Sequence, residues 1–340
     1  MSLSAQQFLD QAQHSPIIDV RSEGEFAQGH IIGALNMPLF NNEERTAVGI
    51  CYKQKGKDAA VLLGLEIVGP KLAGFVKNAK KIAPNGQVLV HCWRGGMRSG
   101  SFAWLLKTAG MQVDFLEGGY KAYRHHVQNS FETLQNVVIL GGATGSGKTE
   151  VLRELKIKGE QVIDLEGLAN HKGSAFGALG QAKQPSAEQF ENLLYEEIKS
   201  LDPNKRVWLE DESRRIGTVY LDQRLWDLMA KAPVVALYVD KAQRVNYLVR
   251  DYGSFDYEQL KYSLDRIQKR LGGQNHQQAE VALAEGNMAT VAEILLAYYD
   301  KAYAHGLSLN AVPALAVESA STDPILNADL VLAKAIEAGI

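Results

Sequence analysis

Residues 136–155 read NVVILGGATGSGKTEVLREL and give the clearest fold signal in the chain. A short apolar run rich in β-branched residues comes first, and a glycine-rich loop and a helical pattern follow it. The loop fits the pattern G-x4-G-K-T between Gly142 and Thr149, in the strand, loop and helix order that a P-loop requires. This order predicts a phosphate-binding turn at the edge of a parallel sheet.

The residues of this loop have the chemistry of a diphosphate site. Backbone N–H groups in a glycine-rich turn can surround phosphate oxygens, Lys148 can neutralise them, and Thr149 can reach a magnesium ion. The predicted diphosphate-binding residues are Gly142, Ala143, Thr144, Gly145, Ser146, Gly147, Lys148 and Thr149. The motif does not say which diphosphate is bound. ATP is the default, and GTP or a diphosphate ester of another alcohol stays open.

Three more apolar runs follow the loop and predict neighbouring parallel strands. They cover residues 160–166, 206–212 and 233–240, and helical patterns separate them. Acidic residues lie at the ends of two of these runs, where they could hold a metal ion or act as a base. The candidates are Asp164, Glu210 and Asp211. The plain alternative is that these carboxylates only solvate the strand ends.

The chain after residue 240 is predicted to be mostly helical, over 241–253, 256–273 and 287–306, with a short strand and a helix after 313. Basic residues alternate there with tyrosines. Basic side chains can form a lid over phosphates, and tyrosines beside them suit contacts with a nucleic acid. A solvated charged face is the alternative. The candidate residues for a lid or a nucleic-acid surface are Arg244, Arg250, Arg266 and Arg270, with Lys269 beside them.

Residues 15–130 show a second alternation of strands and helices. Residues 16–20, 86–92 and 112–118 are predicted strands, and residues 99–110 and the stretch after Gly119 are predicted helices. This alternation predicts a parallel sheet covered by helices. We therefore expect an α/β protein with an N-terminal domain over 1–130, a linker over 131–136 and a P-loop domain over 137–340 that includes the helical region 241–304.

The stretch LVHCWRGGMRSG, residues 89–100, places a cysteine between a strand and a helix. A thiol in such a turn meets backbone N–H groups and the positive end of a helix, and both favour the thiolate. Cys92 is therefore a candidate nucleophile; the alternative is a buried structural thiol. Cys51, the second cysteine, has no such loop around it, and we expect it to be inert or supporting.

Composition narrows the class of protein further. The chain has 340 residues, of which 46% are hydrophobic and 22% are charged, and this suits two soluble domains. The longest apolar run, AAVLLGLEIVGP, is broken by Glu66, so we expect no membrane span and a cytoplasmic protein. Two cysteines give neither a disulfide framework nor metal-ligand spacing. With a net charge of −3, any nucleic-acid surface must be a local patch.

Residues Ile17 to Tyr123 resemble the rhodanese family of sulfur-carrying domains. The resemblance rests on IIDVRSEGEFAQGHIIGALNMPL, LVHCWRGGMRSGSFAWLLKTAG and VDFLEGGYKAY. It implies that Cys92 is the carrier and that Asp19 and Arg21 brace the site. The anion loop would be Trp93, Arg94, Gly95, Gly96, Met97 and Arg98. Common sulfurtransferase loops are one residue shorter, and the spacing here also fits H-C-x-x-G-x-x-R-S, the signature of cysteine-dependent phosphatases. A wider ring of N–H donors suits a tetrahedral, phosphate-like anion.

The order of the two domains resembles the bacterial tRNA 2-selenouridine synthases. The stretches that carry this resemblance are HCWRGGMRS, GATGSGKT, ANHKGSAFG, EDESRRIG and KRLGG. The resemblance implies that sulfur is replaced by selenium in wobble 2-thiouridine of tRNA through an S-geranyl intermediate. The substrates would be geranyl diphosphate, held by the P-loop without ATP hydrolysis, and selenophosphate. Cys92 would attack selenium, expel phosphate and carry the selenium, or the loop would only bind and activate selenophosphate.

The same resemblance sets the expected cofactors and partners. No tightly bound cofactor is expected, and magnesium is an option at the P-loop. The macromolecular partner would be tRNA carrying wobble 2-thiouridine, with a selenophosphate-producing enzyme as a further candidate partner. Two other functions stay open: a rhodanese-fold cysteine phosphatase or sulfurtransferase fused to an ATP-dependent kinase-like domain, and a P-loop ATPase that uses an inactive rhodanese domain for docking. A phosphatase also needs an acid that protonates the leaving oxygen, and the sequence assigns none.

Overall fold

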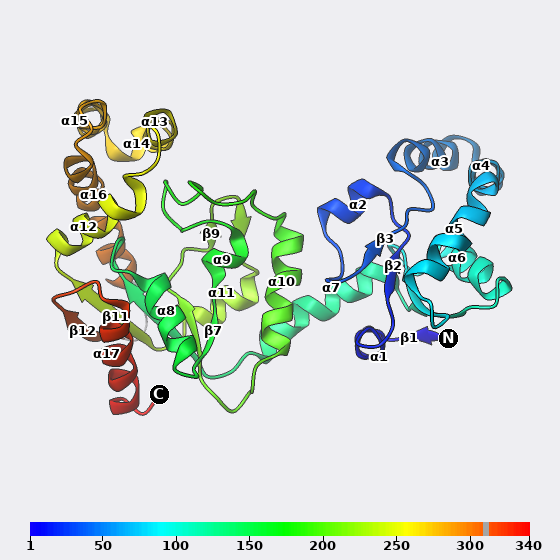
Figure 1. The fold of residues 1–340 in the computed structure, drawn as a ribbon, viewed down its shortest axis with the longest axis horizontal. Helices are drawn as coiled ribbons and strands as arrows, with labels where there is room; N and C mark the ends of the chain where they lie inside the picture. Colours follow the sequence, from blue (N-terminus) through cyan, green and yellow to red (C-terminus); the bar gives the residue numbers. More distant parts are fainter. Residues whose placement is uncertain (309–312) are drawn as a thin grey trace. The chain divides into compact units, whose positions relative to one another are not determined.

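A computed structural model describes residues 1–308 and 313–340 (Figure 1). The chain divides into two compact units. The first comprises Met1–Ser130 with Glu191–Leu193, and the second comprises Phe131–Phe190 with Leu194–Ile340. Each unit is built on a five-stranded sheet in which all strand pairs are parallel. The predicted α/β class with two parallel sheets is confirmed.

The sheet of the first unit has the strand order β1-β5-β4-β2-β3. Its strands are β1 (Ser2–Leu3), β2 (Ile17–Asp19), β3 (Leu35–Asn36), β4 (Gln87–His91) and β5 (Gln112–Leu116). Val88 and Val90 of β4 join a buried cluster with Phe75 and Phe102, which lie on the helices over one face. Because β4 lies between β2 and β5, the loop after it opens at the middle of the carboxyl edge of the sheet, where parallel sheets bind ligands.

Helices cover this sheet and begin at well-formed caps. Ser4, Ser22 and Asn41 each accept a hydrogen bond from the third residue of the helix that follows, in a capping box. The helices are α1 (Ala5–Gln11), α2 (Glu23–Gln28), α3 (Asn42–Lys55), α4 (Lys57–Val68), α5 (Leu72–Ile82), α6 (Met97–Thr108) and α7 (Gly119–Ser130). α6 and α7 begin directly after the loops that follow β4 and β5, so both helix N-termini lie at the carboxyl edge.

One segment of the first unit qualifies as a membrane span by length and composition alone. Within the described part of the chain, Lys57–Ile82 is the one segment that is long and apolar enough to cross a membrane. The 3-10 turn η1 (Gly69–Lys71), which contains a proline, separates α4 from α5 inside this segment. The sequence predicts no membrane span here, because Glu66 interrupts the apolar run. The segment consists of two consecutive helices and not of one regular helix.

The sheet of the second unit has the strand order β12-β11-β6-β8-β7. Its strands are β6 (Val137–Gly142), β7 (Gln161–Ile163), β8 (Val207–Glu210), β11 (Val234–Val239) and β12 (Leu315–Ser319). Every residue of β6 is buried, as expected for the central strand of a parallel sheet. Val138, Leu140, Trp208 and Val235 share one buried cluster. The five predicted strands of this domain, including the short one after residue 313, are confirmed.

The remaining elements of the second unit connect and cover this sheet. The segment predicted as a linker contains a short 3-10 helix, η2 (Phe131–Thr133), whose first residue is fully buried. β9 (Arg215–Ile216) and β10 (Val219–Tyr220) form a short antiparallel pair. The helices are α8 (Lys148–Ile157), α9 (Leu165–Ala169), α10 (Ala187–Lys199), α11 (Gln223–Met229) and α17 (Pro324–Glu337).

The region after Val239 is helical, as predicted, but its helices are divided differently. They are α12 (Lys241–Tyr252), α13 (Tyr257–Asp265), α14 (Gln268–Leu271), α15 (Gly273–Ala284) and α16 (Met288–Ser308), shown in yellow and orange in Figure 1. The single helix predicted over 256–273 is wrong. It ends at Asp265, and Gly272, with a φ of 85°, starts a new helix that the sequence analysis did not predict. Leu260, Leu283 and Leu295 belong to a separate apolar core of this region.

Candidate functional site

The first candidate site is the loop between β4 and α6, which begins at Cys92. The Cys92 side chain is almost fully buried, and its Sγ lies 3.2 Å from Oγ of Ser99 in the first turn of α6. Gly95 adopts a φ of 66°, and Gly96 is the N-cap of α6. Within the described residues, no hydrogen bond is recorded from the backbone N–H groups of Trp93 to Met97. These unpaired donors at the start of a 12-residue helix are suited to an anion.

The first turn of α7 holds the start of this loop in place. The N–H groups of Tyr120 and Lys121 donate to the carbonyl oxygens of Cys92 (2.8 Å) and Trp93 (2.9 Å). Gly119 has a φ of 64°, and a Cβ atom there would lie 2.5 Å from the Cys92 carbonyl oxygen. Only glycine fits this position. The glycine pair in LEGGYKAY was visible in the sequence, but its contact with the cysteine loop was not.

Asp19 and Arg21 form a fully buried ion pair, with 2.6 Å between Arg21 Nη2 and Asp19 Oδ2. Arg21 also donates to the Gly29 carbonyl oxygen (2.7 Å), and its guanidinium lies 3.7 Å from the centre of the Tyr120 ring. The pair is therefore positioned to brace the end of the sheet. His91 lies next to it, 3.6 Å from Asp19 Oδ2. Burial lowers the pKa of His91 to about 4, so its ring is neutral at pH 7.

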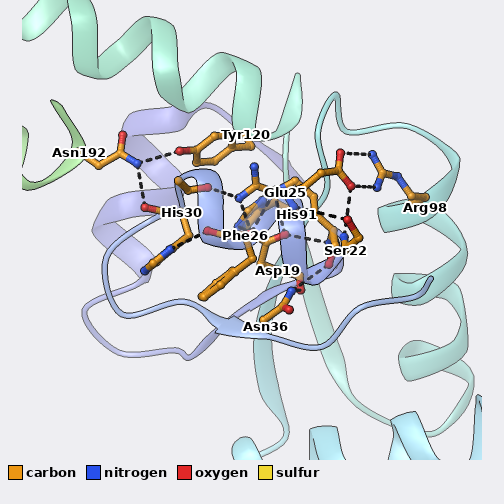
Figure 2. A network of polar contacts seen from close by, with 12 residues as sticks. Asp19, Ser22, Glu25, Phe26, His30, Asn36, His91, Arg98, Tyr120 and Asn192 are labelled. Carbon is orange, nitrogen blue, oxygen red and sulfur yellow. Dashed lines mark hydrogen bonds and ion pairs between the residues drawn. The ribbon is translucent and has the colours of Figure 1, made fainter. Parts of the chain in front are cut away.

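The loop arginines differ in their partners, as Figure 2 shows for Arg98. Arg98 makes two hydrogen bonds to the Glu25 carboxylate, at 2.7 and 3.3 Å, and Arg45 pairs with the same carboxylate at 2.9 Å. Burial opposes the charge of Glu25, but the hydrogen bonds and charges of these arginines lower its pKa to about 2. Arg94 is exposed. Glu25, which the sequence analysis did not single out, thus positions Arg98 at the edge of the loop.

The second candidate site is the P-loop between β6 and α8. Gly145 and Gly147 adopt φ values of 81° and 80°, and the Ser146 N–H donates to the Ala143 carbonyl oxygen at 3.1 Å. Lys148 Nζ donates to the Gly142 carbonyl oxygen at 2.8 Å. The Lys148 side chain therefore lies over the loop in which it is expected to neutralise phosphate oxygens.

Carboxylates surround the start of α8. Thr149 Oγ1 donates to Glu166 Oε2 (3.0 Å), and the Leu165 N–H donates to Glu210 Oε2 (2.9 Å). Asp164 caps α9 by accepting from the Gly167 N–H at 2.6 Å. Burial, with the nearby Asp164 and Glu166 carboxylates, raises the pKa of Glu210 well above its usual range.

Glu166 and Glu212 were not predicted as site residues. Burial and the Glu166 carboxylate raise the pKa of Glu212 well above its usual range, and burial raises that of Asp211, against the attraction of Lys148. Within the described residues, no three His, Cys, Asp or Glu side chains are arranged to hold a metal ion. A magnesium ion here would take most of its ligands from Thr149, one carboxylate and the bound diphosphate.

The predicted lid arginines have different surroundings. Arg244 is buried and donates to the carbonyl oxygens of Val239 (3.1 Å) and Thr144 (3.3 Å), and it pairs with Asp300 at 2.7 Å. Arg244 therefore connects the P-loop to α12 and α16, and these contacts occupy its guanidinium group. Arg250, Arg266 and Arg270 are exposed, and Arg250 and Arg266 lie over the rings of Tyr247 and Tyr262.

A narrow apolar cavity of about 30 Å³ lies beside the P-loop, and we call it the apolar slot. Thr144 of the P-loop forms one wall, and a Cβ atom on Gly145 would lie 3.2 Å from Cγ of Leu248 in the same lining. The Tyr299 hydroxyl accepts a hydrogen bond from the Ala175 N–H at 3.1 Å and is thus occupied. The lining residues are Thr144, Ser174, Phe176, Leu248, Tyr252, Met288, Val291, Ala292, Leu295 and Tyr299.

Comparison with known proteins agrees with both halves of this description. A family model described as the tRNA 2-selenouridine synthase AAA domain matches residues 135–322, and a model of the rhodanese-like domain matches residues 4–126. A tRNA 2-selenouridine synthase from Bordetella petrii is 39% identical over 331 residues, which cover 85% of this chain and 86% of the relative. The chain belongs to the tRNA 2-selenouridine synthase family.

Two solved structures match the chain over shorter stretches. One is an N-terminal domain from a Clostridium difficile 630 protein named for ATP or GTP binding. It is 41% identical, covers 37% of this chain and 98% of its own, and has a TM-score of 0.35. The other is a rhodanese-related protein from Thermoplasma volcanium, which is 18% identical, covers 37% of this chain and 91% of its own, and has a TM-score of 0.24.

Proposed function

We propose that this protein replaces sulfur by selenium in wobble 2-thiouridine of tRNA, in two steps that use geranyl diphosphate and selenophosphate. The observation that carries the proposal is the presence, in one chain of this family, of a nucleophilic thiol in an anion-binding loop and of a complete P-loop beside an apolar slot. The first element suits a phosphate-like selenium donor. The second suits a diphosphate ester with an apolar group.

The first step takes place at the P-loop. The sulfur of 2-thiouridine attacks C1 of the geranyl group, the C1–O bond breaks, and its electron pair leaves with diphosphate. Negative charge grows on the diphosphate as it leaves, so the loop N–H groups and Lys148 stabilise the transition state more than the ground state. No ATP hydrolysis is required.

The apolar slot favours geranyl diphosphate over a nucleotide. Its lining is apolar except for hydroxyl groups, and one of these, on Tyr299, already accepts a backbone hydrogen bond. Such a surface offers little to the polar edge of a base, but it gains free energy by covering hydrocarbon, at about 25 cal/mol per Å². At about 30 Å³ the slot is smaller than a geranyl group, so its wall must move to admit the chain. Met288, which lines the slot, is unbranched and flexible and can make that movement.

The second step uses the Cys92 loop. S-geranylation turns the sulfur of the base into a good leaving group. When selenium adds to C2, the C2–S bond breaks and geranylthiolate departs. Selenophosphate is a tetrahedral oxyanion, and the unpaired N–H groups of Trp93 to Met97 within the described chain are its expected ligands. Arg98 would share its charge between the bound oxyanion and Glu25.

The deciding experiment is incubation of the purified protein with 2-thiouridine-containing tRNA and geranyl diphosphate, and then with selenophosphate. Nucleosides are digested and analysed by mass spectrometry, with ATP omitted and added in parallel. We expect the geranylated and then the selenated nucleoside without ATP. Unchanged tRNA, together with ATP turnover or hydrolysis of an aryl phosphate, would favour the kinase and phosphatase alternative.

A further inference from the structure

We propose that Cys92 takes the phosphoryl group of selenophosphate rather than its selenium, forming S-phosphocysteine and releasing selenium as hydrogen selenide anion beside the base. The identity of the donor rests on the proposed function. In the first half-reaction the Sγ–P bond forms, the P–Se bond breaks, and its electron pair leaves with selenium. In the second, water attacks phosphorus, the S–P bond breaks, its electron pair returns to Sγ, and phosphate departs.

The electron balance favours attack on phosphorus. If the Cys92 thiolate attacked selenium, the electron pair of the P–Se bond would stay on phosphorus, and the product would be phosphite. Release of phosphate by that route needs a two-electron oxidant, which neither the protein nor the proposed substrates supply. Attack on phosphorus changes no oxidation state, and it leaves selenium as the nucleophile that displaces geranylthiolate from C2.

The geometry of the loop suits a phosphoryl group on sulfur. Cys92 Sγ lies at the start of the loop whose N–H groups, from Trp93 to Met97, lack partners in the described chain, so a phosphoryl group on it can have its oxygens bound by that ring. Ser99 Oγ lies 3.2 Å from both Sγ and the Gly96 carbonyl oxygen. When the thiolate leaves in the second half-reaction, this hydroxyl can turn and donate to it.

The groups around the loop also select the leaving group. A phosphatase that acts on oxygen esters needs a protonated acid for the leaving oxygen. Here Glu25 is held ionised by Arg98, with a pKa of about 2, and Asp19 is in a buried ion pair with Arg21. Burial keeps His91 neutral above a pKa of about 4. Hydrogen selenide anion is a weak base and can leave without being protonated. An alkoxide is a strong base and needs a proton from an acid in order to leave.

The test is a rapid-quench reaction of the full-length protein with inorganic selenophosphate labelled with radioactive phosphorus, without tRNA. We expect the label on the peptide that contains Cys92, and more of it in Ser99→Ala, in which hydrolysis of the intermediate is slowed. Cys92→Ser should carry no label in the form of a base-stable phosphate bonded to sulfur. Cys51→Ala should be labelled to the same extent as the parent protein. Alkyl phosphates should be hydrolysed at background rate.

Other outcomes would overturn the inference. A Cys92 adduct with the isotope pattern of selenium, without phosphorus and released by a thiol reductant, would show selenium transfer instead. The absence of any adduct in both the parent protein and Ser99→Ala would show that the loop only binds the donor. If tRNA is selenated but Cys92 stays unlabelled, this inference fails and the proposed function stands. If Cys92 is labelled but tRNA is never selenated, the proposed function fails.

Discussion

Replacement of Glu25 by glutamine tests how the cysteine loop is charged and held. The Glu25 side chain is 16% exposed, and its pKa is lowered from 4.5 to about 2. Since one pKa unit corresponds to about 1.4 kcal/mol, the ionised carboxylate contributes about 3 kcal/mol to the stability of the first unit. Glutamine can keep the capping box with Ser22, so the substitution mainly removes charge.

The stability that Glu25 contributes should depend on pH. Because the folded-state pKa of Glu25 is lowered, its contribution is fully present above pH 4.5 and is lost as the pH falls toward 2. We expect Glu25→Gln to reduce the free energy of unfolding of the first unit by about 2–3 kcal/mol at pH 7 and to match the parent protein near pH 2. Hydrogen exchange of peptides from β2 and β4, followed in urea, measures the difference.

Glu23→Gln is the matched control, because Glu23 lies in the first turn of the same helix and is exposed. Its effect should stay within about 0.5 kcal/mol. The variants should also differ at Cys92: without the Glu25 charge, alkylation by anionic iodoacetate should become several-fold faster relative to neutral iodoacetamide. Equal stability of the two variants at pH 7, or a Glu25→Gln difference that persists unchanged below pH 3, would refute the reasoning.

Three further substitutions test other parts of the sites. Lys148→Ala should slow geranylation by about a hundredfold or more while thiol labelling of the first unit stays normal; unchanged nucleoside yields would contradict the P-loop assignment. Ala292→Phe should fill the apolar slot and raise the KM for geranyl diphosphate about tenfold, and Ala297→Phe, on an exposed position of the same helix, should not; equal KM values would remove the slot from the site. Gly119→Ala should slow thiol labelling of the cysteine loop more than tenfold, because its Cβ would meet loop backbone atoms at 2.4 Å. Gly110→Ala, with a similar positive φ but open space around it, should cost only about 1–2 kcal/mol of stability, and equal labelling of these two variants would count against the loop clash.

Local signals made much of the fold predictable. β-branched runs such as 137–142 are buried on both faces of a parallel sheet, so their hydrophobicity is continuous and easily seen. The glycine turns that follow β4 and β6 indicate in the sequence where the helices α6 and α8 begin. The helical region was harder to predict, because α13, α14 and α15 are separated by turns of only two residues and one residue. The positions of these turns depend on the packing of Leu260, Leu283 and Leu295.

The partners of the site residues could not be predicted, because they depend on long-range contacts. Glu25 and Arg98 are separated by 73 residues, and Arg244 and Thr144 by 100. From sequence, Arg244 and Arg250 look alike, yet burial makes the first a structural brace and leaves the second exposed. Residue type and spacing thus predict the candidate reactive groups, and the tertiary fold decides which of the charged side chains remain exposed.

The Cys92 loop and the P-loop share one backbone arrangement, although our proposals give them opposite chemical tasks. In each, a central parallel strand ends in a glycine turn that opens onto a helix N-terminus, an arrangement that suits the binding of phosphate oxygens. The side chain that each loop presents to those oxygens sets the difference. Lys148 offers a positive charge and no reactive electron pair, so in the proposed reaction the P-loop would stabilise diphosphate as it leaves. Cys92 offers an electron pair, and Glu25 partly neutralises Arg98. Under our further inference, the loop would therefore bind a phosphoryl group, react with it and still release phosphate.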